Sequence, residues 1–240
     1  MQSLEASLKT VRREIQAACE RAGRSPTDVL LIGATKFVPV ETISMARHAG
    51  IADFGENYAG ELAEKANAVD ATWHFIGTLQ AGNASRIGDH AHVVHSAVPG
   101  TAFDRIARRA TRIGKTIRCL VQVDFTGDRN GLEADGVAAF LETAVATPGV
   151  EMIGLMTMPP WLGDAEEARP YFHRLRELRD DLQSDWPGLR ELSMGMSGDF
   201  QVAVEEGATM LRIGTALFGE RPAKRAPERA ERFSRGAKET

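Results

Sequence analysis

Short apolar segments alternate with amphipathic helical patterns through most of this chain. Eight of the segments fit buried β-strands, at residues 29–34, 52–54, 73–76, 92–95, 117–123, 150–155, 189–193 and 210–213. The clearest helical patterns lie between them, at residues 39–49, 103–113, 137–145 and 168–182. This alternation predicts a single α/β domain, a (β/α)8 TIM barrel. A doubly wound open sheet is the alternative, because pattern alone defines the ends of such short strands poorly.

An additional helix precedes the first predicted strand, and a charged tail follows the last. Leu4, Leu8, Val11, Ile15 and Cys19 recur at helical spacing, and Gly23 is the predicted stop. Residues 221–240 carry seven Lys or Arg against three Glu, an excess of four positive charges, which is typical of a solvated segment. We therefore expect a barrel domain over residues 1–222, with an extra N-terminal helix, and a charged tail over 223–240.

Composition limits the classes of partner. The 240 residues are 43% hydrophobic and 26% charged, with a net charge of −4, so no overall basic footprint for nucleic acid exists. No apolar run approaches the roughly 20 residues of a membrane span, and no signal segment opens the chain. Cys19 and Cys119 lack metal-ligand spacing and fit reduced core thiols. We expect a cytoplasmic protein that binds neither nucleic acid nor membranes.

Lys36 stands just after the first predicted strand, in the stretch Ala34-Thr35-Lys36-Phe37. In a barrel the strand would place Lys36 at the C-terminal mouth, where active sites form. Burial there would lower the lysine pKa from about 10.4 and expose the nucleophilic amine that forms a Schiff base. The alternative is a lysine that extends from the strand end into solvent.

The loops after the seventh and eighth strands have the composition of an anion site. Ser197 is the predicted N-cap of a helical stretch that runs to Glu206, and the first-turn N–H groups of that helix would face an anion. Gly214 and Thr215 would add a backbone N–H and a hydroxyl from the other loop. The alternative is that Ser197 only caps its helix and Gly214 only turns the chain.

In a closed barrel the eighth strand pairs with the first, so the predicted anion site would adjoin Lys36. A ligand with an aldehyde at one end and a phosphate at the other would bridge them. Pyridoxal 5′-phosphate (PLP) has this shape.

Six segments also carry a family resemblance, in order from the first strand to beyond the eighth. They are Ala34-Thr35-Lys36, Phe54-Gly55-Glu56-Asn57-Tyr58, Trp73-His74-Phe75-Ile76-Gly77-Thr78-Leu79-Gln80, Gly154-Leu155-Met156-Thr157-Met158, Leu192-Ser193-Met194-Gly195-Met196-Ser197 and Arg212-Ile213-Gly214-Thr215-Ala216-Leu217-Phe218-Gly219. The chain resembles the pyridoxal-phosphate homeostasis proteins of the YggS type, relatives of the N-terminal barrel of alanine racemase. The resemblance covers nearly all of the chain before the tail.

The resemblance implies a role for each of six residues. Lys36 would hold PLP as a Schiff base, and Asn57 would lie near the cofactor ring. The phosphate would be held by Ser197, Gly214 and Thr215, and the pyridine nitrogen would face Arg212. Because arginine stays protonated, it cannot give a proton to that nitrogen, and the ring remains a poor electron sink. The alternative for Arg212 is a salt bridge to a neighbouring carboxylate.

Three other polar residues have less specific roles. His74 and His95 lie on strand patterns and are expected to be hydrogen-bonded core histidines rather than catalysts. Tyr58 would either line the pocket or pack beside the helix that follows the first strand.

Several expected lysines are absent around the mouth. The family usually has Lys-x-Lys-Pro after the first strand, whereas this chain has Lys36-Phe37-Val38-Pro39. The loop at residues 81–84 lacks the lysine of the usual Ser-Asn-Lys pattern, and the segment 124–131 lacks an expected asparagine and lysine. These changes put in doubt an accessory cofactor site or a transfer surface built from those lysines.

Two functional classes follow from this. The first is a monomeric PLP carrier for cofactor homeostasis, without robust turnover, whose partners would include PLP-dependent apo-enzymes. The second is a fold-type III PLP-dependent amino-acid racemase. Alanine racemase takes its opposing tyrosine base from a second domain, but the tyrosines of this chain, Tyr58 and Tyr171, both lie in the predicted barrel. An aldolase-like Schiff-base enzyme without cofactor is a third, weaker alternative.

Overall fold

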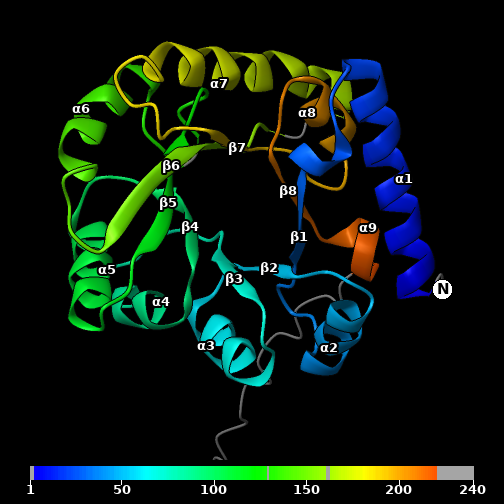
Figure 1. The fold of residues 1–240 in the computed structure, drawn as a ribbon, viewed down its shortest axis with the longest axis horizontal. Helices are drawn as coiled ribbons and strands as arrows, with labels where there is room; N and C mark the ends of the chain where they lie inside the picture. Colours follow the sequence, from blue (N-terminus) through cyan, green and yellow to red (C-terminus); the bar gives the residue numbers. More distant parts are fainter. Residues whose placement is uncertain (1–2, 129, 161–162, 221–240) are drawn as a thin grey trace, which may run out of the picture.

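The chain folds into a closed barrel of parallel strands with helices around it (Figure 1). The computed structural model describes residues 3–128, 130–160 and 163–220. Its strands are β1 (Leu30–Ala34), β2 (Asp53–Glu56), β3 (Thr72–Phe75), β4 (Val93–Ala97), β5 (Ile117–Val123), β6 (Val150–Thr157), β7 (Glu191–Ser193) and β8 (Met210–Ile213). The helices are α1 (Leu4–Ala22), α2 (Val40–His48), α3 (Ala59–Ala68), α4 (Ala84–His90), α5 (Thr101–Arg112), α6 (Ala134–Ala144), α7 (Arg169–Leu182), α8 (Phe200–Glu205) and α9 (Thr215–Phe218), with short 3₁₀ turns η1 (Pro26–Asp28) and η2 (Ala165–Ala168).

Barrel closure depends on the pairing of the first and last strands. Leu30 pairs with Met210 and Ile32 with Arg212, in parallel register. The predicted (β/α)8 barrel is therefore confirmed, and the open sheet is wrong. The same register brings the loop after β8 next to the loop that carries Lys36.

The strands are apolar on both faces because each face packs against a different core. Inside the barrel, a small cluster includes Ile32, Leu120 and Met156. Outside, a larger continuous core fills the space between the strands and the helices, where Phe54 and Trp73 stack with ring centroids 5.6 Å apart. Burial on both faces explains why the strands are largely apolar without a strict alternation, and the few polar residues inside the barrel are hydrogen-bonded to one another.

The extra N-terminal helix is confirmed as α1. Ser3 caps its start by accepting a hydrogen bond from the Ala6 N–H, and the helix ends at Gly23 as predicted. Cys19 and Cys119 are buried free thiols, which confirms that prediction. The predicted tail, residues 223–240, lies outside the described residues, so its boundary stays a prediction. Within the described ranges, no helix is long and apolar enough to cross a membrane.

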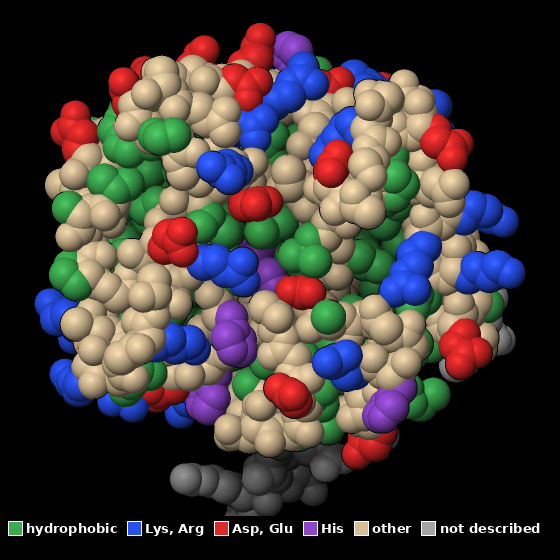
Figure 2. All heavy atoms as spheres, viewed as in Figure 1, with side chains coloured by type: hydrophobic (Ala, Val, Ile, Leu, Met, Phe, Trp, Pro, Cys, Tyr) green, Lys and Arg blue, Asp and Glu red, His purple; other side chains and the backbone are tan. Residues whose placement is uncertain are grey.

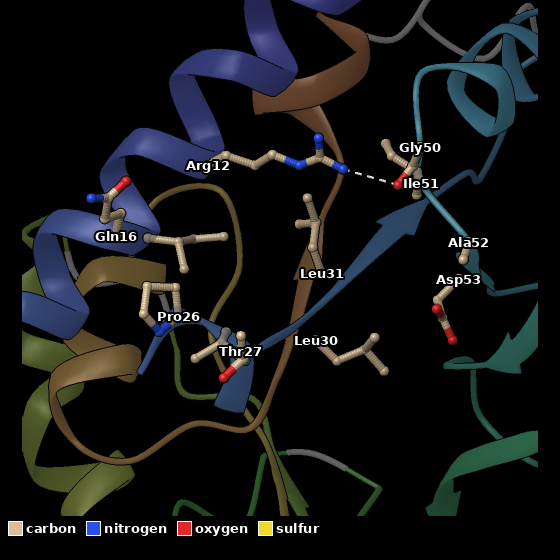
Figure 3. A pocket seen from close by; sticks show the side chains of 12 residues that line it. Arg12, Gln16, Pro26, Thr27, Leu30, Leu31, Gly50, Ile51, Ala52 and Asp53 are labelled. Carbon is tan, nitrogen blue, oxygen red and sulfur yellow. Dashed lines mark hydrogen bonds between the residues drawn. The ribbon is translucent and has the colours of Figure 1, made fainter. Parts of the chain in front are cut away.

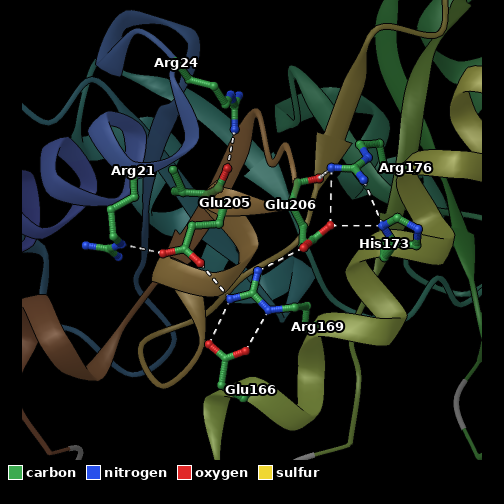
Figure 4. Close-up of polar contacts among 9 residues, drawn as sticks. Arg21, Arg24, Glu166, Arg169, His173, Arg176, Glu205 and Glu206 are labelled. Carbon is green, nitrogen blue, oxygen red and sulfur yellow. Dashed lines mark hydrogen bonds and ion pairs between the residues drawn. The ribbon is translucent and has the colours of Figure 1, made fainter.

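An ion-pair cluster connects α8 to α1 and α7 (Figure 4). Arg169, at the start of α7, donates to Glu205 and Glu206 at the end of α8, over 2.7 and 2.9 Å. Arg21 of α1 donates to Glu205 over 2.7 Å. Arg176 and His173 of α7 also contact the Glu206 carboxylate. These contacts fix the C-terminal end of α8, whose N-terminal end follows the loop that carries Ser197.

Figure 2 shows side chains of both charge signs around the rim of one face, with aspartate and glutamate gathered at the upper left and lysine and arginine at the lower left and right. Hydrophobic side chains lie at the upper left and near the centre of this face.

Candidate functional site

A cavity of about 440 Å³ opens at the C-terminal ends of the strands. That volume lies within the range typical of small-ligand pockets. All six residues singled out in the sequence line it: Lys36, Asn57, Ser197, Arg212, Gly214 and Thr215. The remaining lining residues, which sequence reasoning missed, are mostly apolar: Ala34, Ile76, Met158, Met196 and Gly198. Of these, Ala34, Ile76, Met158 and Met196 lie inside the resembling segments, which was the available signal.

Lys36 lies two residues beyond the end of β1 and is half-buried. Its Nζ lies 5.0 Å from the ring centroid of Phe37 and 5.1 Å from that of Tyr58. The amine forms no ion pair with any residue that the structure describes. Tyr58 is 42% exposed and packs on Phe37, with ring centroids 5.7 Å apart, rather than lining the cavity. The amine therefore sits against two aromatic rings at the cavity wall.

The turn after Lys36 has an unusual backbone. Phe37 has φ of 62°, in the left-handed region that a bulky residue rarely adopts. Its N–H donates to Glu61 Oε2 over 2.9 Å, so a side chain from α3 fixes the turn. Such a conformation persists only where its surroundings determine it. The backbone next to Lys36 is thus held by α3.

A buried charge cluster lies beneath this turn, and we call Lys65, Glu56, Glu61 and Thr35 the Lys65 cluster. Lys65 Nζ donates to Glu56 Oε1, Glu61 Oε2 and the Thr35 carbonyl over 2.6, 2.7 and 2.7 Å. Thr35 Oγ1 lies 2.6 Å from Glu56 Oε1. Burial raises the pKa of Glu56 despite these bonds, and its Oε2 has no hydrogen-bond partner in the described structure. This cluster could not be predicted from the sequence, because Glu61 and Lys65 have the i,i+4 spacing of an ordinary surface pair.

Asn57 follows β2 and lies against the turn after β3. A Cβ atom on Gly77 would lie 2.1 Å from the Asn57 carbonyl oxygen, a distance that backbone atoms cannot tolerate. Gly77 therefore permits the close approach that brings Asn57 to the cavity wall.

The loops after β7 and β8 meet at Ser197. Its Oγ accepts hydrogen bonds from the Gly214 N–H over 3.3 Å and the Ala216 N–H over 3.2 Å. The prediction that Ser197 caps the following helix is wrong. Residue Asp199 holds the N-cap position of α8, and its carboxylate accepts from the Met196 N–H over 2.6 Å. Ser197 lies too far ahead of the helix to cap it and turns toward the β8 loop instead.

Arg212 is buried inside the barrel, with only 4% of its surface exposed. Nη1 donates to Ser193 Oγ, and Nη2 donates to the Thr157 carbonyl over 3.0 Å. The alternative role for Arg212, a salt bridge to a neighbouring carboxylate, is not observed in the described part of the chain. Burial lowers the pKa of Arg212 to about 10, which still leaves it protonated at neutral pH.

The two interior histidines are hydrogen-bonded core residues, as predicted. His74 Nδ1 and His95 Nε2 lie 2.8 Å apart, and both side chains are fully buried. Burial lowers the pKa of both rings, so both are neutral at pH 7. The described residues contain no group of three or more His, Cys, Asp or Glu side chains that could hold a metal ion.

Solved structures share this fold. A PipY protein of Synechococcus elongatus, solved with PLP bound, superposes with a TM-score of 0.75 at 33% identity, over 86% of this chain and 100% of that one. A protein of unknown function from Bifidobacterium adolescentis superposes with a TM-score of 0.83 at 29% identity, over 90% and 94% of the two chains. An alanine racemase of Clostridium difficile, with a TM-score of 0.66 at 14% identity over 89% and 60% of the chains, shows a likeness of fold alone.

Sequence comparisons define the family. The family model for the alanine racemase N-terminal domain matches residues 7–222. A pyridoxal phosphate homeostasis protein of Aquifex aeolicus is 42% identical over 89% of this chain and 96% of its own length. One from Pseudomonas aeruginosa is 35% identical over 92% and 97%. The barrel, its cavity and these matches together show that this chain belongs to the family of pyridoxal phosphate homeostasis proteins.

Proposed function

We propose that this protein binds PLP as a Schiff base on Lys36 and acts in intracellular PLP homeostasis, without robust catalytic turnover. The observation that carries the proposal is the cavity itself. It joins a lysine amine and a buried arginine, neither of which has a carboxylate partner among the described residues, with the two loops that meet at Ser197. PipY, solved with PLP bound, and the relatives named pyridoxal phosphate homeostasis protein support the same ligand and role.

The residues fit the two reactive ends of PLP. The cofactor supplies an aldehyde that condenses with a lysine amine and releases water. Lys36 provides that amine. The N–H groups of Gly214 and Ala216 already point toward the Ser197 hydroxyl, so an anion beside Ser197 would meet both. Thr215, at the rim of the cavity, adds a hydroxyl, and Asn57 would contact the ring.

Arg212 favours a carrier over an enzyme. The guanidinium keeps its protons at neutral pH and would not transfer one to a pyridine nitrogen, which would therefore stay uncharged. An uncharged pyridine withdraws electrons weakly and would restrain carbanion chemistry at the Schiff base. Arg212 would thus hold the ring in place while limiting reaction on it.

The decisive experiment traps the adduct. Purified protein loaded with PLP should be yellow, and borohydride reduction should add the cofactor mass to the peptide that contains Lys36. Lys36→Ala should lose the adduct and keep its far-UV circular dichroism, whereas Lys9→Ala, an exposed lysine on α1, should trap PLP like the natural protein. A protein that cannot be loaded with PLP, or an adduct on another lysine, would refute the proposal. Failure to load PLP would favour an aldolase-like Schiff-base enzyme without cofactor.

The phosphate loops can be tested separately. Ser197→Ala removes the hydroxyl that accepts the Gly214 and Ala216 N–H groups, and it should weaken PLP binding more than it lowers the melting temperature. Ser184→Ala is the matched control, because the Ser184 hydroxyl donates only to the Asp181 carbonyl on the exposed end of α7. Equal loss of affinity and stability in Ser197→Ala would indicate a structural role alone.

The competing activity is amino-acid racemisation. Deuterium exchange at the α-carbon of amino acids, followed by NMR, measures it directly. Exchange at about 1 s⁻¹ or faster would overturn the carrier proposal in favour of an enzyme. The cytoplasmic location, the monomeric state and transfer of PLP to apo-enzymes stay predictions, to be checked by fractionation, size-exclusion chromatography and reconstitution of an apo-enzyme.

A further inference from the structure

A chain of hydrogen bonds crosses the barrel interior between Asp53 and Arg212. His74 Nε2 lies 3.0 Å from Asp53 Oδ1, and its Nδ1 lies 2.8 Å from His95 Nε2. His95 Nδ1 lies 2.7 Å from Ser193 Oγ, which accepts from Arg212 Nη1. His95 is on β4 and Ser193 on β7, which are not neighbouring strands, so the chain passes through the barrel centre.

The two ends of this chain fix the direction of every bond. Arginine can only donate, so Ser193 accepts from Arg212 and turns its own proton toward His95 Nδ1. A carboxylate can only accept, so His74 Nε2 carries a proton and donates it to Asp53. His95 Nε2 then donates to His74 Nδ1, and each neutral ring carries its single proton on Nε2. The opposite direction would leave the Ser193 proton without an acceptor within the chain.

We propose that Asp53, His74, His95 and Ser193 act as positioning residues that hold the Arg212 guanidinium in place in the cofactor cavity. The set is called the Arg212 relay. Every hydrogen-bond dipole in it has its negative end toward Arg212, and a full negative charge stands at the far end. A buried cation without a carboxylate partner is otherwise costly. The oriented chain gives Arg212 an indirect counter-charge and one fixed direction for Nη1.

The far end of the relay lies in a second cavity, at the N-terminal ends of the strands (Figure 3). This cavity, of about 420 Å³, is lined by Asp53, Leu30 and Arg12 among others. Arg12 donates to the Gly50 carbonyl over 2.9 Å and forms no salt bridge with Asp53 within the described residues. The Asp53 side chain is 14% exposed, while both histidine side chains and Ser193 are fully buried. The carboxylate is therefore the member of the relay that water can reach.

The histidine tautomers test the relay without any ligand. Two-bond ¹H–¹⁵N correlation spectra of the ligand-free protein at neutral pH should show His74 and His95 both neutral with the proton on Nε2. A proton on Nδ1 of either ring, or a doubly protonated ring, would overturn the proposal. This measurement is independent of PLP, so it separates failure of the relay from failure of the proposed function on which its cofactor role rests.

Asp53→Asn tests what the charge does. The amide keeps an oxygen that can accept from His74 and removes only the negative charge. We expect PLP to bind about 3- to 10-fold more weakly, and the histidine signals to show a mixture of tautomers. Asp70→Asn is the matched control, because Asp70 is an exposed carboxylate in the turn before β3. It should change neither PLP affinity nor the histidine tautomers. Binding by Asp53→Asn within twofold of the natural protein would overturn the role assigned to the charge.

Discussion

Replacement of Lys65 by methionine provides a quantitative test of the buried cluster beneath Lys36. Methionine has an unbranched side chain of similar length but cannot donate to Glu56, Glu61 or the Thr35 carbonyl. The Lys65 side chain is 5% exposed, that of Glu56 is 0% exposed and that of Glu61 is 23% exposed. Without Lys65, the partly exposed Glu61 carboxylate can be hydrated again, whereas the Glu56 carboxylate cannot. The loss of stability therefore comes mainly from Glu56, which becomes an uncompensated buried charge.

Breaking a buried pair by removal of one partner costs about 3–5 kcal/mol. We expect a loss of that size in the free energy of unfolding at pH 7. For a urea m-value of about 2–3 kcal/mol per molar, the midpoint would fall by about 1–2.5 M. Urea unfolding followed by circular dichroism and by tryptophan fluorescence measures this loss. Trp73 is 1% exposed beside Phe54, so its emission reports the barrel.

The loss should depend on pH with a definite sign. Without Lys65, the pKa of Glu56, already raised by burial from 4.5, should rise further. Between 4.5 and that raised pKa the folded state binds a proton that the unfolded state does not, so stability increases as the pH falls through this window. The deficit in unfolding free energy of Lys65→Met relative to the natural protein should therefore narrow as the pH falls from 7 toward 4.5.

Two controls accompany this variant. Adding Glu56→Gln to Lys65→Met removes the stranded charge and should recover more than half of the loss. Lys115→Met removes a half-buried lysine whose Nζ makes a 3.3 Å bond to the Asp89 carbonyl, and it should cost less than about 1 kcal/mol. A Lys65→Met loss below about 1 kcal/mol, or one that does not vary with pH, would refute the reasoning.

Other sites yield three simpler tests. Gly195→Ala should lower stability by about 1–3 kcal/mol in thermal unfolding, since Gly195 has φ of 95° and a Cβ there would lie 2.6 Å from that of Ala203; an unchanged melting temperature would contradict this. Burial raises the pKa of Cys119 to about 12, so its thiol should react with Ellman's reagent only after unfolding, and rapid labelling of the native protein would count against that. Because burial lowers the pKa of His74 and His95, both rings should titrate by NMR with midpoints below the ordinary value of about 6.5, and a midpoint at 6.5 or above would show that the rings are hydrated.

The fold could be predicted largely from local patterns. Strands such as β5 and β6 are largely apolar, and α1 and α5 have one apolar face, so each element bears the signature of its own burial. Closure of the barrel could be predicted from the number and alternation of strands and helices, but no single residue indicated it. The wrong prediction that Ser197 caps α8 also rested on local sequence, because a serine two residues ahead of an N-cap resembles a cap. Only the position of the β8 loop shows which N–H groups donate to its hydroxyl.

The sequence by itself determined the elements, their order and six of the residues that line the cavity, because apolar periodicity and motif identity are properties of consecutive residues. Tertiary structure alone decided their partners. Lys65 on α3 meets Glu56 from β2, and His95 on β4 meets Ser193 from β7, 98 positions later. Packing of α3 against the end of β2 creates the first contact, and barrel closure creates the second, because it brings strands distant in sequence around one water-excluding interior. There a polar side chain must find a partner, whatever its spacing along the chain.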